Sequence, residues 1–453
     1  MYEREFKIVV IGGNDAGLSA AGRAKRKHPR AKVSVVEQTL YTSYASCGLR
    51  YLVSGQVEAN LLSGPDADTL SRERGFEVFT GHRVVDINLI KRTLSVEIVA
   101  EKKHIEMRYH KLILATGAAP VVPDLFKVDA KNCFTLRNFS DALRISQFCT
   151  QQAARHALIV GGGYVGLEVA ESLQQRGLSV SLVEKQDSFY SALHPDISSR
   201  IMQKISATGL HTCPGNGVAD LELAAGAIKS VLLTTGKRIE QIDLVVLATG
   251  IRPDADLAKV ANIPVGSSGA IQVNRSQQTR RMNVYAAGDC CESIHLVSGK
   301  PVWAPFAAIA SKQGRVAGDN AAGGRERFPG VLQTRLLRVF DLEFGSTGLD
   351  EESAHRAGLE TDSTVIQHND RALYIDGKQT VTIVLIVARG SKRVVGAQVL
   401  GAAGSGQRLN ILATAIAGRY TVDELAFLDL GYIPEISPVW DPILVAAQVA
   451  KKK

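Results

Sequence analysis

KIVVIGGNDAG, at residues 7–17 of this 453-residue chain, reads as an apolar strand that runs directly into a glycine-rich turn. A helical stretch follows, and a second strand at residues 32–36 ends at Glu37. Strand, glycine turn, helix, strand and acid, in this order, are typical of a parallel, doubly wound sheet that binds a dinucleotide. Glycine lets the backbone approach the pyrophosphate, and the acid accepts hydrogen bonds from ribose hydroxyls.

The same unit occurs a second time. LIVGGGYVG, at residues 158–166, is followed by a helical stretch and by a strand that ends at Glu184. Here the glycine pattern is complete, with Gly161, Gly163 and Gly166, and Glu184 follows at the expected spacing of roughly 20 residues. The alternative, that the glycines only form tight turns, is weakened because strand, helix and acid occur together. Two copies of the unit predict two bound dinucleotides.

The two copies are assigned to different cofactors. The first departs from the usual pattern, because Asn14 stands between Gly12 and Gly17 where a glycine is common. Its place near the N-terminus is typical of FAD-binding chains, so we assign it to FAD. In the second copy, the carboxylate of Glu184 suits a free 2′-hydroxyl and repels a 2′-phosphate, which favours NADH. The adjacent Lys185 leaves NADPH possible.

The composition is that of a globular protein, with 45% hydrophobic and 22% charged residues. The formal charge of +8 indicates either a solvated basic surface or attraction of an anionic substrate. Nucleic-acid binding is not expected, because no helix-turn-helix, zinc-finger or aromatic RNA-binding motif accompanies the charge. No membrane span is expected either, because no uncharged apolar run approaches the ~18 residues that a span needs.

The cysteines argue against a metal site and against a disulfide scaffold. The six cysteines show no regular spacing and no C-x-x-C pattern. A chain of this length needs no disulfides for stability, so we expect a reducing compartment. The N-terminal residues enter a strand almost at once and lack the apolar core of a signal peptide. These features predict a cytoplasmic protein without a metal.

Further motifs make the chain recognisable. Apolar strands at residues 112–117 and 244–250 both stop at Ala-Thr-Gly, YAAGD at residues 285–289 follows shortly after Thr279, and SYASCGL occupies residues 43–49. With these motifs and the two glycine units, the chain resembles the pyridine nucleotide-disulfide oxidoreductase superfamily over essentially its full length. It looks most like the single-cysteine branch that contains coenzyme A-disulfide reductases, NADH oxidases and peroxidases, and NAD(P)H-dependent persulfide reductases.

The resemblance implies an α/β fold with two doubly wound, Rossmann-like dinucleotide-binding domains and a C-terminal α+β dimerisation domain. It divides the chain into an FAD-binding domain at 1–118 and 246–325, an NAD(P)H-binding domain at 119–245 and a dimerisation domain at 326–453. A homodimer is therefore expected, and Asp289 is expected to bind the ribityl chain of FAD. The predicted cofactor-binding residues are Gly12, Asn14, Gly17, Glu37, Thr116, Gly117, Gly288, Asp289, Gly161, Gly163, Gly166, Glu184 and Gly250.

Cys47 is the predicted redox residue. Dithiol reductases of the superfamily carry a second cysteine five positions earlier, where this chain has Thr42, so an internal disulfide at this site is excluded. A lone cysteine beside a flavin can form a mixed disulfide or a persulfide with a substrate, or a sulfenic acid. The alternative is a structural thiol. Cys290 and Cys291 are interpreted as packing residues, because adjacent cysteines rarely close an unstrained disulfide.

Departures from related enzymes narrow the chemistry. Peroxidases of the branch carry a histidine in the first glycine turn, where this chain has Asp15, and no histidine follows His368 to serve as the base of dithiol reductases. Coenzyme A-disulfide reductases use tyrosines instead. The resemblance assigns this catalytic role to Tyr432 and Tyr374, and ordinary interface packing is the alternative.

Four residues are predicted to bind substrate. Lys25 and Arg26 lie on the first helix, where coenzyme A-disulfide reductases have arginines that face substrate phosphates; a solvated basic face is the alternative. Ser43 matches another substrate-contacting position. Arg50 replaces the proline that usually follows Cys-Gly-Leu in this branch. Its guanidinium either favours a Cys47 thiolate or holds a substrate anion, or it points to solvent.

These features predict an FAD-dependent NAD(P)H oxidoreductase that reduces a disulfide or persulfide of a small thiol through a polarised Cys47 thiolate. The coenzyme A-disulfide reductases are its expected relatives, and Tyr432 is expected to act across the interface of a homodimer. One alternative is an NADH oxidase that forms peroxide or water through a sulfenic acid. A second is a flavin-binding redox sensor with negligible turnover.

Overall fold

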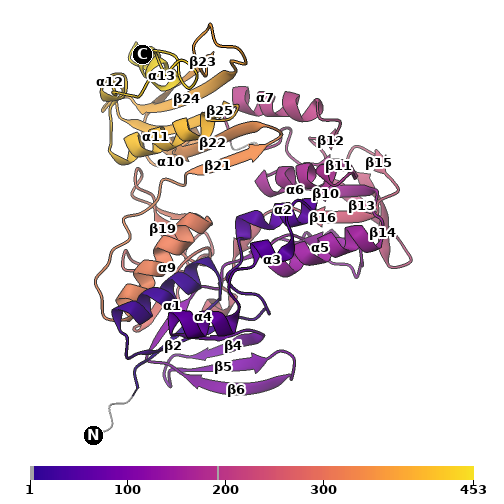
Figure 1. Cartoon of the computed structure of the whole chain (residues 1–453), viewed down its shortest axis with the longest axis vertical. Coiled ribbons are helices and arrows are strands. Elements are labelled where there is room, and N and C mark those ends of the chain that lie inside the picture. The colour runs from indigo at the N-terminus through magenta and orange to yellow at the C-terminus, as the bar shows by residue number, and fades with distance from the viewer. Residues whose placement is uncertain (1–4, 191–192, 453) are drawn as a thin grey trace.

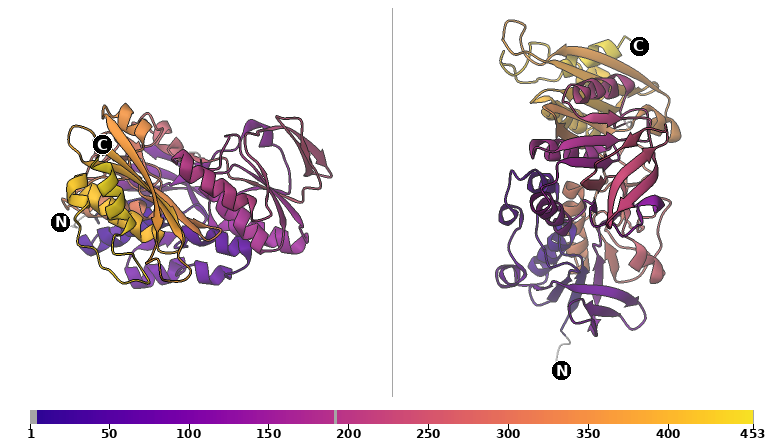
Figure 2. Two further views of the ribbon diagram at one scale, coloured as in Figure 1. Left: turned by 90° about the horizontal axis from the view of Figure 1, so that it is seen from above. Right: turned by 90° about the vertical axis from the view of Figure 1, so that its right-hand side faces the viewer.

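The structure is a computed structural model that describes residues 5–190 and 193–452. Figure 1 shows the described chain as a lower lobe, a lobe on the right and an upper lobe that holds the C-terminal residues. The right-hand view of Figure 2 shows from another side that the lower and upper lobes lie at opposite ends of the long axis. Among the described residues, no helix is long and apolar enough to cross a membrane.

The lower lobe is built on a parallel sheet in the order β18–β7–β1–β2–β3. Successive side chains of β1 face opposite sides: Ile8 and Val10 pack under α1 and α9, whereas Val9 and Ile11 face the antiparallel sheet β4–β5–β6. Both faces of the parallel sheet are therefore buried, which explains the unbroken apolar run. The elements are β1 (Lys7–Ile11), α1 (Asp15–Lys27), β2 (Lys32–Val36), η1 (Ser46–Gly48), α2 (Leu49–Ser54), α3 (Ala59–Leu62), α4 (Ala67–Arg74), β3 (Glu77–Phe79), β4 (His82–Asn88), β5 (Thr93–Ile98), β6 (Lys103–Arg108), β7 (Lys111–Leu114), α8 (Asp256–Val260), β18 (Val284–Ala286), β19 (Glu292–Ile294), β20 (Pro301–Trp303) and α9 (Ala307–Ala321).

The right-hand lobe repeats this plan with a parallel sheet in the order β12–β11–β10–β16–β9. The two sheets, each with its glycine turn and helix, confirm the predicted class of doubly wound α/β domains. The predicted boundary between residues 245 and 246 falls inside β16, which pairs with β10 and β9. The elements are η2 (Asp124–Phe126), β9 (Cys133–Thr135), α5 (Phe139–Gln151), β10 (His156–Val160), α6 (Tyr164–Gln175), β11 (Ser179–Val183), α7 (Pro195–Ser206), β12 (His211–Cys213), β13 (Val218–Ala224), β14 (Ala227–Leu233), β15 (Arg238–Ile239) and β16 (Leu244–Leu247).

A short antiparallel ribbon connects these two lobes. Its strands are the two passages of the chain between the lobes, and they pair with each other. The hydroxyl of Thr116 donates to the carbonyl of Asp254 at 2.5 Å, and the hydroxyl of Thr249 donates to the carbonyl of Val121 at 2.6 Å. The threonines of the two Ala-Thr-Gly motifs therefore lock the two passages together reciprocally. The strands are β8 (Ala118–Pro120) and β17 (Ile251–Pro253).

The helix α2 crosses from one lobe to the other. It follows the first two strands of the lower lobe in the chain, yet Leu49, Leu52 and Val53 join the apolar core of the right-hand lobe. In that core they pack with residues of α5 and α6, among them Phe139 and Leu167. The position of α2 is therefore set by the second doubly wound domain.

The upper lobe is an antiparallel sheet in the order β21–β22–β25–β24–β23, covered by α11 and α13. Its outer surface exposes several large apolar side chains, as expected for a surface that a second subunit covers. They are Leu373, Tyr374, Phe427, Tyr432, Ile433, Ile436, Val439 and Trp440. The elements are β21 (Arg335–Val339), β22 (Leu342–Gly348), α10 (Glu351–Arg356), β23 (Thr361–Asn369), β24 (Thr380–Ala388), β25 (Val394–Gly401), α11 (Ser405–Ala417), α12 (Val422–Leu425) and α13 (Pro442–Ala450).

Candidate active site

The two glycine turns use the same hydrogen bonds. The backbone N–H of Gly13 donates to a carboxylate oxygen of Glu37 at 2.8 Å, and that of Gly162 donates to Glu184 at 2.5 Å. In both units the acid at the end of the second strand therefore closes the turn. The carboxylates keep further acceptor positions for ribose hydroxyls, so this geometry suits the predicted role of both acids.

The first glycine of each turn is required by the backbone. Gly12 has φ of +109° and Gly161 has φ of +108°, a region that side chains disfavour. A Cβ on Gly12 would lie 2.1 Å from the carbonyl oxygen of Ala115, and one on Gly161 would lie 2.4 Å from that of Ala248. Each turn thus packs directly on the alanine of an Ala-Thr-Gly strand.

The third turn position tolerates a side chain, which explains Asn14. Its φ is −124°, and the equivalent Gly163 has φ of −72°. No described atom lies within 4 Å of a Cβ built on Gly163. Asn14 therefore leaves the turn unchanged.

Both helix N-termini suit a pyrophosphate. Among the described residues, no side chain caps the first turn of α1 or of α6 by a hydrogen bond. The backbone N–H groups at these ends are thus available, and the helix dipole adds positive potential. The residues present fit FAD at α1 and a nicotinamide dinucleotide at α6.

Asp289 follows the strand β18 of the first sheet, and its side chain is 15% exposed. Its carboxylate accepts a hydrogen bond from the guanidinium of Arg137 at 2.8 Å, and its carbonyl accepts one from the indole of Trp303 at 2.7 Å. The preceding Gly288 donates its N–H to Gln313 at 2.8 Å. Burial raises the pKa of Asp289, and Arg137 opposes that shift. The surroundings suit the predicted contact between Asp289 and a sugar hydroxyl.

Arg137 was not found from the sequence. It precedes Asn138, the N-cap of α5, and sequence patterns there indicate only the helix start. Its side chain reaches from the right-hand lobe to Asp289 and to the carbonyl of Ala118, which belongs to the ribbon. Arg137 thus places a positive charge between the two dinucleotide sites.

The remaining predicted cofactor residues lie at two kinds of position. Gly17 and Gly166 lie in the first turns of their helices. A Cβ on Gly17 would lie 1.8 Å from the carbonyl oxygen of Gly12, and one on Gly166 would lie 1.9 Å from that of Gly161. Thr116, Gly117 and Gly250 lie beside the ribbon. The carbonyls of Gly117 and Gly250 accept backbone hydrogen bonds at 3.0 Å and 2.9 Å that continue the pairing of the two passages.

Cys47 lies on the short helix η1 beside the N-terminus of α1. The hydroxyl of the adjacent Ser46 donates to the carboxylate of Asp15 at 3.1 Å. The partner position of dithiol reductases holds Thr42, which is buried and donates to the carbonyl of Gly13. The single cysteine therefore lies next to the end of α1 that fits the FAD pyrophosphate, and its side chain is exposed.

The charges near Cys47 differ from those we predicted. The surrounding protein desolvates the thiolate and raises the pKa of Cys47, and the carboxylates of Asp15, Glu168 and Asp289 raise it further. A hydrogen bond from Ser46 opposes the shift. The charged neighbours that act on Cys47 are thus anions, and the polarised thiolate stays a prediction.

Arg50 also has partners that we did not predict. Its side chain is only 15% exposed, and its guanidinium forms ion pairs with Glu168 at 3.3 Å and Glu171 at 3.4 Å. The guanidinium therefore does not point to solvent, and that interpretation is corrected. The sequence could not place the carboxylates of α6 beside α2.

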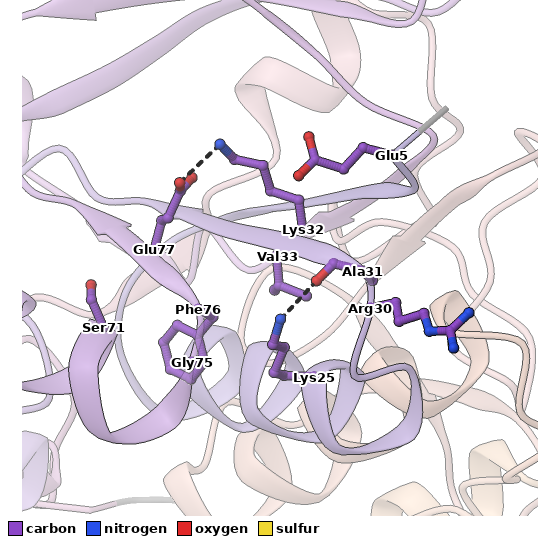
Figure 3. Close-up of a pocket in the computed structure, with 10 residues that line it drawn as sticks. All are labelled: Glu5, Lys25, Arg30, Ala31, Lys32, Val33, Ser71, Gly75, Phe76 and Glu77. Carbon is purple, nitrogen blue, oxygen red and sulfur yellow. Dashed lines mark hydrogen bonds and ion pairs between the residues drawn. The ribbon is translucent and has the colours of Figure 1, made fainter. Parts of the chain in front are cut away.

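The other predicted substrate residues are spread along α1 and the segment before η1. Lys25 donates to the carbonyl of Ala31 at 3.0 Å and lines a pocket of about 330 Å³ at the C-terminal end of α1 (Figure 3). Arg26 is exposed. Ser43 adopts φ of +56°, and its carbonyl accepts from Gly64 at 2.6 Å.

Tyr374 and Tyr432 meet on the upper lobe. A hydrogen bond between their side chains raises the pKa of Tyr432. Both are exposed within the apolar surface of that lobe. Cys290 and Cys291 are buried free thiols, which confirms that they are packing residues.

Two glycine turns that each fit a dinucleotide, with one cysteine beside the first of them, are the features of an oxidoreductase that uses two dinucleotides. The chain belongs to the pyridine nucleotide-disulphide oxidoreductase family, whose sequence model matches residues 6–314. The dimerisation domain of that family matches residues 336–442. This confirms the predicted resemblance, and the cofactors are FAD and NAD(P)H.

Relatives with different names share the whole length of the chain. The NAD(P)H sulfur oxidoreductase (CoA-dependent) of Pyrococcus furiosus is 34% identical over 450 residues, 98% of this chain and 99% of that protein. An NADH oxidase of Methanocaldococcus jannaschii is 30% identical over 451 residues, 99% of each chain. The solved structure of a NAD-dependent persulfide reductase from A. fulgidus superposes with a TM-score of 0.93 and 35% identity, covering 99% of this chain and 83% of that one.

Proposed function

We propose that this enzyme uses NAD(P)H to reduce the disulfide or persulfide of a low-molecular-weight thiol, through FAD and Cys47. The observation that carries the proposal is the position of this single exposed cysteine beside the N-terminus of α1, with Thr42 in the place of a second cysteine. The names of the Pyrococcus and A. fulgidus relatives support sulfur as the acceptor. Glu184 favours NADH, and the free cysteines favour a cytoplasmic location.

The sulfur chemistry of Cys47 balances as a two-electron reduction. The thiolate attacks one sulfur of a disulfide, forms a mixed disulfide and releases the first thiolate, which takes up a proton. FAD held at the glycine turn of α1 and by Asp289 would supply the two electrons that reduce sulfur, with NAD(P)H as their source. Cleavage of the mixed disulfide then releases the second thiol and restores the Cys47 thiolate. With a persulfide as substrate, the same reaction steps release one thiol and hydrogen sulfide.

Three side chains are proposed to handle protons near this sulfur. Burial raises the pKa of Asp15, which lies one hydrogen bond from Ser46, so this carboxyl holds a proton more readily than an exposed aspartate. In the homodimer that we propose, Tyr432 and Tyr374 are supplied across the interface and protonate the leaving thiolate. Their exposure within the apolar surface of the dimerisation domain supports this arrangement.

The spacing of residues along α1 suggests how long the thiol substrate is. Asp15 and Arg26 are eleven residues apart, about three helical turns, so they lie on the same face of α1 and about 16 Å apart. Lys25 is turned away from that face by about 80°. A substrate that reaches from Cys47 along α1 to Arg26 must be extended and carry a distal anion, as coenzyme A does.

We predict that Arg26→Ala raises the KM for coenzyme A disulfide about tenfold, because one charge-assisted contact is lost, and leaves kcat nearly unchanged. Lys25→Ala is the matched control, because that ammonium already donates to Ala31. Steady-state kinetics with coenzyme A disulfide and glutathione disulfide check this. An equal effect of Arg26→Ala on both substrates would contradict the contact with a distal phosphate.

An anaerobic turnover panel tests the function itself. We expect the enzyme to oxidise NADH rapidly with coenzyme A disulfide or coenzyme A persulfide, and slowly with glutathione disulfide or polysulfide. Oxygen uptake with saturating NADH is measured separately. Fast, Cys47-dependent oxygen uptake together with negligible sulfur reduction would replace the proposal with an NADH oxidase, the name of the Methanocaldococcus relative.

A further inference from the structure

Arg50 lies where three parts of the chain meet. It is in the first turn of α2, three residues after Cys47. Its guanidinium pairs with Glu168 and Glu171 of α6 at 3.3 Å and 3.4 Å. It also donates to the carbonyl of Arg338, in β21 of the dimerisation domain, at 3.0 Å. We call these contacts the Arg50 junction.

The dimerisation domain contributes the tip of a hairpin to this junction. Phe340 and Asp341 connect β21 to β22 with φ of +50° and +66°, which is the geometry of a tight two-residue turn. The N–H of Phe340 donates to Glu171 at 3.0 Å. The hairpin is thus held from both sides, by Arg50 through the Arg338 carbonyl and by Glu171 through Phe340.

The charges of the junction are largely removed from water. The exposed fractions of the side chains are 15% for Arg50, 14% for Glu171 and 29% for Glu168. Loss of the guanidinium would leave two partly buried carboxylates without a counter-charge, which is the costly way to break such a network. A proline, which is usual at this position in the branch, has no donor that could replace it.

The Arg50 junction also connects the turn that holds Cys47 with the helix α6. Glu168 is one helical turn beyond the glycine turn that opens α6, and Cys47 is about one turn before Arg50. The apolar side of α2 already packs in the core beside α6. Arg50 therefore fastens the sulfur-bearing turn to the helix that fits the nicotinamide dinucleotide.

We infer that Arg50 is a positioning residue that fixes Cys47 against α6 and against the β21–β22 hairpin, and so makes sulfur reduction depend on the docked dimerisation domain. This inference rests on the proposed reaction of Cys47. It is an alternative to the predicted role of Arg50 in binding substrate, and it is supported by the contacts of both terminal nitrogens of the guanidinium with protein acceptors.

Arg50 also acts on Cys47 through Glu168. Desolvation and Asp15 raise the pKa of the Cys47 thiol most, the Glu168 carboxylate raises it further, and Arg50 holds Glu168 in an ion pair. Arg50 lowers the pKa of Glu168 against the larger effect of burial. Without the guanidinium, a Glu168 that is still ionised at the pH where a thiol titrates is no longer compensated, so the Cys47 thiolate forms at higher pH.

Two variants of the FAD-loaded enzyme test this. Arg50→Gln is expected to lower kcat for disulfide reduction about tenfold while the substrate KM changes less than about twofold. The pH midpoint for alkylation of Cys47 by iodoacetamide is expected to rise. Adding Glu168→Gln to this variant should return the midpoint toward the wild-type value, because the uncompensated charge is removed. A merely structural role would not predict that rescue.

The opposite pattern would overturn the inference. A large rise in KM with an unchanged alkylation midpoint would make Arg50 a substrate-binding residue. If Arg50→Gln does not fold, Arg50→Lys is measured instead, since it keeps the charge but loses the planar two-carboxylate geometry. A lower kcat with little change in KM then supports the positioning role, and a raised KM with unchanged kcat overturns it. Alkylation requires no turnover, so its pH midpoint can be measured even in an enzyme that reduces no disulfide. The experiment therefore distinguishes failure of the proposed function from failure of the proposed role of Arg50.

Discussion

Replacing Cys47 with serine is expected to abolish reduction of disulfides and persulfides, by at least about 10³-fold, while FAD is still reduced by NADH. A serine hydroxyl has nearly the same size as the thiol, but it forms no covalent bond to the sulfur of the substrate. The glycine turns and Asp289, which fit the cofactors, do not depend on this side chain. Anaerobic stopped-flow measurements of flavin reduction, followed by steady-state turnover, separate the two half-reactions.

Cys133→Ser is the matched control for this variant. Cys133 lies in β9 of the second doubly wound domain, and burial raises the pKa of its thiol to about 11. A thiol with so little thiolate at neutral pH is a poor nucleophile, so turnover should be retained. Full turnover of Cys47→Ser would end the proposal, whereas loss of flavin reduction would show that the variant disturbs cofactor binding instead.

The second large effect is expected for Gly161→Ala. A Cβ at this position would lie 2.4 Å from the carbonyl oxygen of Ala248, on a backbone with φ of +108°. Clash and strain together cost of order 3 kcal/mol or more. We expect a lower temperature for the first unfolding transition in calorimetry and loss of FAD reduction by NADH.

Gly163→Ala is the control within the same turn. Its φ of −72° suits alanine, and no described atom lies within 4 Å of the added Cβ. Stability should stay within about 1 kcal/mol of the wild type. Asn14 already fills the equivalent position of the first turn. Equal destabilisation by the two alanines would show that the turns are not held by close contact with the Ala-Thr-Gly strands.

The doubly wound sheets were predictable because their signals are local. An apolar run, a glycine turn and an acid occur within about 30 residues of each other, so one segment carries the whole unit. The predicted cysteine and the two tyrosines were likewise found from short motifs. Their assembly into a site stays a prediction, because the proposed role of the tyrosines needs a second subunit.

The partners of charged residues could not be predicted in the same way. Arg50 and Glu168 are separated by more than 100 residues, and nothing near either residue announces the other. Arg137 and Asp289 are a second such pair. From the sequence, an arginine close to a cysteine suggested a stabilised thiolate. Only the packing of α2 on α6 shows that the partners of this arginine are carboxylates.

The reciprocal threonine bonds of the ribbon have a practical consequence. Val121 and Thr249 are hydrogen-bonded neighbours, so the segment between them starts and finishes at one point on the rest of the molecule. A domain whose two ends are adjacent can be exchanged for a related domain, because the connections to the rest of the chain are not strained. The nucleotide preference of this enzyme should therefore be open to redesign by cassette exchange, provided that the replacement keeps acidic residues facing Arg50.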